Sequence, residues 1–304
     1  MASTGTAPAR RSTVAASVNS DREGGAPKAE VSARVRQGAH WFFWIVALAA
    51  LNSLVSAQTN YKVITVLGGG TIAGSVNWSG PMPRELDFPV TKDQKICDPE
   101  SKKIVDLDRL IIGPQGGVAN TIVYLKDVSS GKAFDMPQAR RHLNQLHCRY
   151  VPHILLVPEN AVLQMESSDA TLHTVHMEGA ATFNLPFPFE HQVTSRVMST
   201  PGLVHIVCNG GHVWMSAEMM VAPHPYYAVT DESGRFELTD VPAGTYQIVA
   251  WHEGWNLTGK QQVYDVLSQE KVSRPVFTEP KMWDQSVTVT GGKMSMVNFV
   301  ISGK

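Results

Sequence analysis

Residues 202–215 read GLVHIVCNGGHVWM and carry the strongest local pattern in this chain. The first half is an aliphatic and β-branched run that ends at Cys208, which is typical of a buried strand. Two glycines follow and let the backbone turn tightly before His212 and Met215. A thiol, an imidazole and a thioether in one such loop are ligands that suit a soft metal ion. The stretch therefore predicts a metal-binding loop after a β-strand.

A second imidazole is expected from a neighbouring strand. His173 lies in the strand-like run Leu172–Met177, far enough before Cys208 for other strands to intervene. Because side chains alternate across a strand, residues 173 and 175 share one face and His176 lies on the other. This alternation favours His173 over His176 as the ligand.

Two plainer readings stay open for the sulfur atoms. Met219 and Met220 are alternatives to Met215, and a methionine most often fills a core. An isolated buried cysteine is usually inert, and Cys208 alone would be read in that way. The clustering in one loop favours the metal site, with the ligands His173, Cys208, His212 and Met215.

The rest of the chain also favours strands over helices. Short runs rich in Val, Ile, Thr and aromatic residues alternate with Gly, Pro and Asp clusters, which indicates a sandwich or a barrel. Residues 226–238 and 240–252 each resemble a hairpin with a glycine at its turn. Residues 135–146 are expected to form a short helix or an irregular crossover. The fold class is predicted to be all-β.

The N-terminal part has the features of an export leader. Residues 1–38 have no apolar period and are expected to be disordered. Residues 39–57 combine a preceding positive flank, a short apolar run and small residues at Val55-Ser56-Ala57. This pattern predicts a signal peptide cut after Ala57, with an uncleaved membrane anchor as the alternative. Either way, the remaining chain is expected in the periplasm or outside the cell.

That location affects how the three cysteines are interpreted, because disulfides persist in oxidising compartments. Cys97 and Cys148 both lie beside polar or turn residues, and we pair them as a structural disulfide. Cys208 is then the free thiol. The formal net charge is −1, with no clustered basic face, so nucleic acid is not expected as a partner.

The last segment resembles the carboxypeptidase regulatory-like, transthyretin-like β-sandwich family. The likeness lies in the stretches Thr230–Phe236 and Val241–Tyr246, and Ile72–Val76 resembles the usual opening strand. If these pieces form one sandwich, the block between them is an insertion. Such a module predicts a fold but little chemistry.

The middle block resembles the cupredoxins, small blue-copper proteins such as plastocyanin, and the exported bacterial fusions of a plastocyanin-like part with the regulatory-like module. The residues that carry it are Asp169–His176, Pro201–Cys208 and His212–Met215. The resemblance implies one type-1-like copper held by the four residues above. Two departures are the Cys-x3-His spacing, one residue longer than is usual in the closer relatives, and Thr174 where the family usually has Asn.

The predicted segments are a disordered arm (1–38), the signal peptide or anchor (39–57), an N-terminal β region with the first strands of the regulatory-like sandwich (58–147), the cupredoxin-like Greek-key domain (148–222) and the carboxypeptidase regulatory-like β-sandwich (223–304). The expected function is one-electron transfer, or an accessory role in an extracytoplasmic redox system, with an unidentified redox partner protein.

We do not expect an enzyme, because a copper enzyme would need a further metal cluster or an open coordination position, and the sequence shows no convincing His-rich set for either. The alternative from a different class is a metal-free β-sandwich module for interaction or adhesion at the cell envelope.

Overall fold

The computed structural model describes residues 61–82, 87–135, 141–265 and 268–303. All of them belong to one compact unit, Val55–Lys304. The predicted arm (1–38) and the predicted signal peptide or anchor (39–57) lie outside the described residues. No helix in the described part of the chain has the length and apolar character needed to cross a membrane.

The regular secondary structure of the described residues is almost entirely β-strand, which confirms the predicted fold class. The single helix assigned in these ranges is the short α1, Gln94–Cys97. The strands are, in chain order, β1 (Lys62–Val63), β2 (Gly70–Ser79), β3 (Asp87–Pro89), β4 (Ile104–Asp106), β5 (Ile122–Leu125), β6 (Ser130–Gly131), β7 (His142–Leu146), β8 (Arg149–Val151), β9 (Ile154–Pro158), β10 (Ala161–Ser167), β11 (His173–Gly179), β12 (Phe183–Phe187), β13 (Gln192–Met198), β14 (Gly202–Val207), β15 (Ser216–Ala222), β16 (Tyr227–Val229), β17 (Arg235–Val241), β18 (Gly244–His252), β19 (Leu257–Asp265), β20 (Glu270–Phe277), β21 (Lys281–Val289) and β22 (Met294–Ser302).

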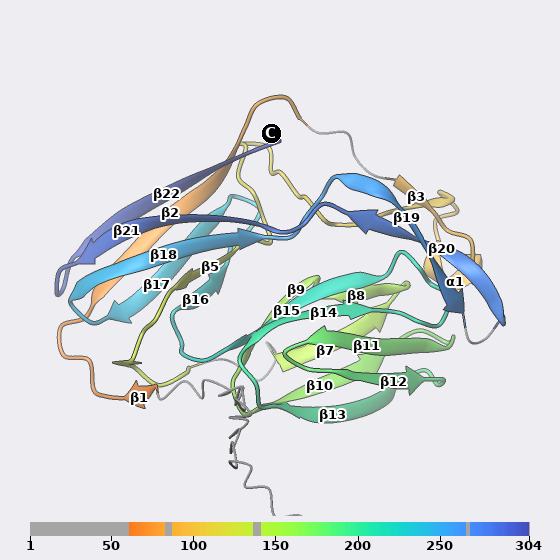
Figure 1. The fold of residues 1–304 in the computed structure, drawn as a ribbon, viewed down its shortest axis with the longest axis horizontal. Helices are drawn as coiled ribbons and strands as arrows, with labels where there is room; N and C mark the ends of the chain where they lie inside the picture. The colour runs from red at the N-terminus through yellow and green to blue at the C-terminus, as the bar shows by residue number, and fades with distance from the viewer. Residues whose placement is uncertain (1–60, 83–86, 136–140, 266–267, 304) are drawn as a thin grey trace, which may run out of the picture. The chain divides into compact units, whose positions relative to one another are not determined.

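The first sandwich combines strands from both ends of the described chain (Figure 1). One sheet has the order β16-β5-β18-β21 and the other has the order β17-β2-β22. Along β2 buried residues alternate with partly exposed ones, because one face of the strand packs on the core. Gly74 allows β2 to approach β22, since a Cβ at this position would lie 1.6 Å from the carbonyl oxygen of Val297. The opening strand and the C-terminal strands therefore form one sheet.

The second sandwich is built from the middle of the chain. Its five-stranded sheet has the order β12-β11-β14-β15-β9, and its four-stranded sheet has the order β13-β10-β7-β8. Buried side chains from both sheets fill one core, among them Leu143, Leu163, Val175, Ile206 and Met219. In sequence this sandwich lies between β2 and β17, two strands of the first sandwich.

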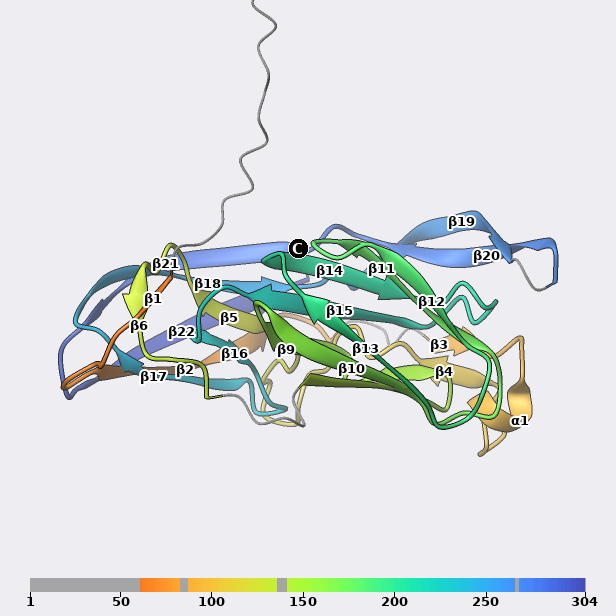
Figure 2. The ribbon, with the colours of Figure 1, turned by 90° about the horizontal axis from the view of Figure 1, so that it is seen from below.

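Two further segments pack against this second sandwich. One contains β3, α1 and β4, and the other is the hairpin of β19 and β20. Figure 2 shows both at the same end of the described unit, where Lys92 Nζ lies 3.4 Å from Asp265 Oδ2. Val263 and Phe277 of the hairpin pack against the second core. The helix or crossover predicted for residues 135–146 is wrong for His142–Leu146, which pairs with β10 and β8 as the strand β7.

Candidate metal centre

Strand pairing brings the predicted ligands together from two parts of the chain. His173 is the first residue of β11, and Cys208 directly follows β14. These two strands are antiparallel neighbours, with His176 opposite Val207. The start of β11 therefore lies beside the end of β14. His212 follows Cys208 in the loop that leads to β15.

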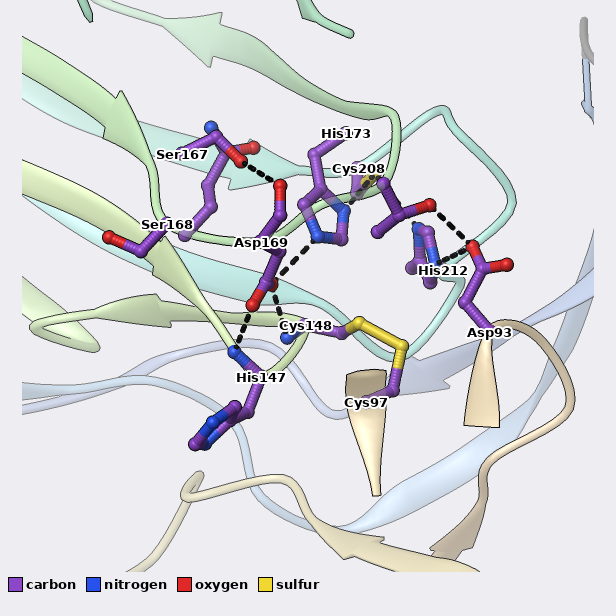
Figure 3. Close-up of polar contacts among 12 residues, drawn as sticks. Asp93, Cys97, His147, Cys148, Ser167, Ser168, Asp169, His173, Cys208 and His212 are labelled. Carbon is purple, nitrogen blue, oxygen red and sulfur yellow. Dashed lines mark hydrogen bonds and ion pairs between the residues drawn. A yellow bond between two sulfur atoms is a disulfide. The ribbon is translucent and has the colours of Figure 1, made fainter. Parts of the chain in front are cut away.

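The two imidazoles approach the thiol through equivalent nitrogen atoms (Figure 3). His173 Nδ1 and His212 Nδ1 each lie 3.9 Å from Cys208 Sγ. The centroids of the two rings are 4.4 Å apart. All three side chains are fully buried, at 0% exposure. One sulfur and two nitrogen donors thus converge on one buried point.

The loop between Cys208 and Met215 is closed by its own backbone. The Met215 N–H donates to the carbonyl oxygen of His212 at 3.0 Å, and the Cys208 N–H donates to that of Met215 at 3.4 Å. Gly211 takes a positive φ of 87°, a conformation that favours glycine at this turn. Met215 is buried in the core next to this turn and remains our proposed fourth ligand. The alternatives Met219 and Met220 lie in β15, opposite Val204 and Leu203.

The surroundings of Cys208 favour the thiolate. Its Sγ accepts the backbone N–H groups of Gly210 at 3.3 Å and Thr174 at 3.4 Å. Burial alone would raise the pKa of the Cys208 thiol, but hydrogen bonds and charge from His173 and His212 hold it well below its usual value. The thiolate is the form of cysteine that binds a metal ion.

A carboxylate holds each imidazole from the opposite side. His173 Nε2 lies 2.9 Å from Asp169 Oδ2, and His212 Nε2 lies 2.9 Å from Asp93 Oδ2. Because an ionised carboxylate only accepts, both Nε2 atoms are assigned the proton. In the metal-free chain a proton on Nδ1 can donate to the Cys208 thiolate, and on metal binding the deprotonated Nδ1 would offer its lone pair to the ion. Carboxylate partners of this kind fix the tautomer and the orientation of metal-binding histidines.

Asp169 is itself fixed by the backbone. Its carboxylate accepts the N–H of His147 at 2.7 Å and that of Cys148 at 2.8 Å. Burial would raise the pKa of Asp169, but the hydrogen bonds from His173 and from these two amides outweigh burial and lower it. In the metal-free chain, burial would also lower the pKa of His173. Its hydrogen bonds with Asp169 and Cys208 prevail and raise it to about 9.

Asp93 comes from outside the second sandwich, in the segment that leads into α1. Its Oδ2 also accepts the hydroxyl of Thr171 at 2.7 Å. Burial would raise the pKa of this carboxyl, but the Thr171 hydroxyl and the adjacent His212 lower it. The segment thus contributes an anionic group to a centre whose predicted ligands all lie on other elements.

Thr174 connects the two parts of the centre. Its hydroxyl oxygen accepts the N–H of Asn209 at 2.7 Å, while its own N–H donates to Cys208 Sγ. Asn is usual at this position in the cupredoxins that the sequence resembles. A hydroxyl makes the connection here, so the departure noted in the sequence does not separate the two loops.

The predicted disulfide is confirmed. Cys97 and Cys148 are bonded, with their Cα atoms 4.9 Å apart, and Cys208 is the free cysteine. The bond joins the end of α1 to the turn between β7 and β8. It therefore connects the segment of Asp93 to the loop whose amides hold Asp169 (Figure 3).

Two basic residues hold the ligand loop in place from other elements. Arg274 of β20 donates to the carbonyl oxygen of Cys208 at 2.8 Å and to Asn209 Oδ1 at 2.9 Å. Lys92 Nζ donates to the carbonyl oxygen of Gly210 at 2.7 Å. Sequence reasoning missed both residues and the two aspartates. Asp169 alone had a local signal, its position four residues before His173.

A comparison of the sequence with family models matches residues 224–276 to the second beta sandwich domain of BOS complex subunit NOMO1-like proteins. This match covers β16 to β19 and most of β20, which is less than half of the chain. A comparison with curated proteins gives no match.

Solved structures that resemble this chain include copper proteins. A purple cupredoxin from Nitrosopumilus maritimus has 16% identity and a TM-score of 0.24, over 27% of this chain and 98% of that one. An oxidised mutant of amicyanin has 19% identity and a TM-score of 0.26, over 30% and 89%. A copper-containing nitrite reductase from Thermus scotoductus SA-01 has 15% identity and a TM-score of 0.25, over 27% of this chain and 22% of the enzyme. The metal centre is therefore inferred from its side chains and not from these similarities.

Proposed function

We propose that this chain is an exported, type-1-like copper protein. It carries one electron at a time or serves as an accessory subunit of an extracytoplasmic redox system. The observation that carries the proposal is the convergence of His173 Nδ1 and His212 Nδ1 on Cys208 Sγ, each at 3.9 Å, with all three side chains buried. A thiolate with two imidazoles is the donor set of electron-transfer copper sites.

The donor set also fits copper better than the other common metals. Hard ions such as Mg²⁺ and Ca²⁺ prefer oxygen ligands, whereas the donor group around Cys208, among the described residues, contains two imidazoles and no carboxylate. Structural zinc takes four strong ligands, whereas three His or Cys donors and the proposed thioether of Met215 are present here. Bound copper would supply a one-electron redox couple.

The protein's own residues would keep that couple fast and reversible. Asp93 and Asp169 hold the two imidazoles in one orientation, so the ligands need not rearrange when the charge of the site changes. The amides of Gly210 and Thr174 donate to Cys208 Sγ and stabilise the thiolate. Complete burial of the three donors excludes water as a competing ligand. A redox partner protein supplies or removes the electron, and we propose no catalytic step.

The proposed location is the periplasm or the cell exterior. A disulfide between Cys97 and Cys148 fits an oxidising compartment. The match of residues 224–276 to a NOMO1-like β-sandwich domain also fits a secretory or membrane-associated protein. Anchoring through residues 39–57 belongs to the same proposal.

Metal analysis of the exported protein, together with its visible spectrum, tests the proposal. We expect one copper per chain and an intense thiolate-to-copper absorption band, which Cys208→Ser removes. A colourless protein without stoichiometric copper after reconstitution refutes it. That result would favour the metal-free interaction module, for which Cys208→Ser should change neither folding nor binding.

A further inference from the structure

The disulfide lies against both imidazoles of the candidate centre. The sulfur atoms of Cys97 and Cys148 and a ring nitrogen of His212 all lie within 4.8 Å of one another. The Cys148 sulfur, a carboxylate oxygen of Asp169 and a ring nitrogen of His173 also lie within 4.8 Å of one another. Figure 3 shows the disulfide beside these side chains. The disulfide thus joins two segments and also places its sulfur atoms next to the imidazoles of the centre.

We propose that Cys97, Cys148 and His212 form a second metal site, which opens when the disulfide is reduced and takes Cu(I). Cys208 is not a ligand of this site, so the inference does not depend on copper binding there. A dithiol reductant opens it by exchange. The reductant becomes a disulfide, and its two electrons and two protons leave Cys97 and Cys148 as thiols.

The donor set of the opened site suits a soft monovalent ion. Each thiol loses its proton when it binds Cu(I), and the two thiolates with one imidazole give a three-coordinate site. Soft sulfur ligands select Cu(I) over harder ions. The three donor residues are already close together in the oxidised chain, so little of the binding free energy is used to gather them.

Other contacts hold the two cysteines in place after the disulfide opens. The backbone N–H of Cys97 donates to the carbonyl oxygen of Asp93 at 3.0 Å, and the carboxylate of Asp93 contacts Thr171 and His212. On the other side the N–H of Cys148 donates to Asp169 Oδ2 at 2.8 Å. Reduction therefore removes one covalent link and leaves hydrogen bonds on both sides of it.

A reductant is expected to approach the disulfide from the side of Cys97. Cys97 lines an open depression of about 300 Å³, together with Lys102, His147 and Arg149 among others. Cys148 is fully buried, whereas Cys97 is 6% exposed. The attack is therefore expected at Cys97, with Cys148 as the leaving thiolate.

The two sites share His212. When His212 binds a metal ion together with Cys97 and Cys148, it cannot also bind one together with Cys208. The two metal positions therefore compete for one ligand. A reducing environment would move Cu(I) towards Cys97 and Cys148. An oxidising environment would close the disulfide and leave Cys208 as the only cysteine ligand among the described residues.

The test uses the full chain with Cys208→Ser, so that the first centre has no thiolate. Oxidised protein, and protein reduced with dithiothreitol and then freed of it without air, are each titrated with Cu(I) in competition with bicinchoninate. We expect the reduced chain to take one Cu(I) and the oxidised chain to take none. X-ray absorption of the loaded chain should show two sulfur neighbours and one nitrogen neighbour.

Two further variants show whether the folded site is responsible. In the Cys208→Ser background, His212→Ala should weaken Cu(I) binding by more than about tenfold, because removing a ligand should cost at least as much as removing an outer partner of a ligand. The matched His173→Gln, which keeps a donor for Asp169, should change it much less. Equal binding by reduced and oxidised chains, no effect of His212→Ala, or loss of the β-sheet circular dichroism on reduction would each overturn the proposal. A colourless wild-type protein would instead refute the proposed function and leave this result unaffected.

Discussion

Asp93 Oδ2 accepts a hydrogen bond from His212 Nε2 over 2.9 Å and thereby connects a segment outside the second sandwich to the candidate metal centre. Asp93→Asn removes the negative charge and keeps the shape of the side chain. We expect a 10- to 100-fold weaker copper affinity, roughly the loss seen when such a partner is removed. Competition with a chelator of known affinity measures it.

Asp98→Asn is the matched control for this change. Asp98 belongs to the same segment, but its carboxylate accepts the backbone N–H groups of Lys102 and Lys103 and makes none of the contacts with the imidazoles. Its substitution should leave copper affinity unchanged. An equal loss in both variants would mean that the charge of the segment matters and the contact with His212 does not.

Thr174→Val should destabilise the protein through one hydrogen bond. The Thr174 hydroxyl accepts the N–H of Asn209 at 2.7 Å, and Thr174 is 6% exposed. Valine has nearly the same shape but no acceptor, so this N–H is left without its partner at a cost of about 1–3 kcal/mol. Urea unfolding of the metal-free protein measures the change. Thr174→Ser keeps the hydroxyl and should cost less, and an equal loss would show that the methyl group matters more.

The sequence predicted the parts of the centre that depend on local patterns. Alternation along a strand favoured His173 over His176, and the structure buries His173 while His176 contacts Glu178 near the surface. The glycines after Cys208 predicted a tight turn, and Gly211 has a positive φ. Many of the strands were also predictable, because their apolar residues alternate with polar ones along the segment.

The contacts between distant segments were not predictable in this way. Asp93 and His212 are 119 residues apart, and no period or spacing relates them. The strand β12 was missed because Pro186 interrupts its pattern. It lies at the edge of its sheet, where a proline costs no hydrogen bond in the ladder. Local propensity cannot show which strand will be at an edge.

Asp169 should make the stability of the metal-free protein depend on pH in the acidic range. Its pKa is lower in the folded chain than in the unfolded one, because the hydrogen bonds from His173, Cys148 and His147 outweigh burial. A depressed carboxyl pKa stabilises the fold above the unfolded value, near pH 4, and this stabilisation is lost as the pH falls through the folded value. The free energy of unfolding of the wild type should therefore exceed that of Asp169→Asn most at pH 7. This difference should close below pH 4. A gap that stays constant with pH would contradict this assignment.

Cys208 should be a thiolate at neutral pH even without metal. Its pKa lies well below the usual value, since burial, which raises it, is outweighed by His173 and His212. Wild type should therefore show ultraviolet thiolate absorption that Cys208→Ser lacks. Because the side chain is 0% exposed, a bulky disulfide reagent should react with it only after unfolding. Absorption that appears only in alkaline solution would show that the two imidazoles do not stabilise the thiolate.

The largest loss of stability is expected from a buried carboxylate that is not one of the groups around Cys208. Glu253 is 1% exposed and makes an ion pair with Arg109 at 2.6 Å, and its other oxygen contacts His153 Nε2. Arg109 also donates to the Ser216 hydroxyl and the Gly254 carbonyl oxygen. These contacts join the end of β18 to the start of β15, so Glu253 connects strands of both sandwiches.

Glu253→Gln leaves the buried guanidinium without a counter-charge, and breaking a buried pair in this way costs about 3–5 kcal/mol. Urea unfolding at neutral pH measures it. The exposed pair of Glu100 and Lys102 is the control, because water screens it and Glu100→Gln should change nothing measurable. If Glu253→Gln were equally silent, water would have to reach Arg109 in solution, and the two sandwiches would be less tightly joined than these contacts indicate.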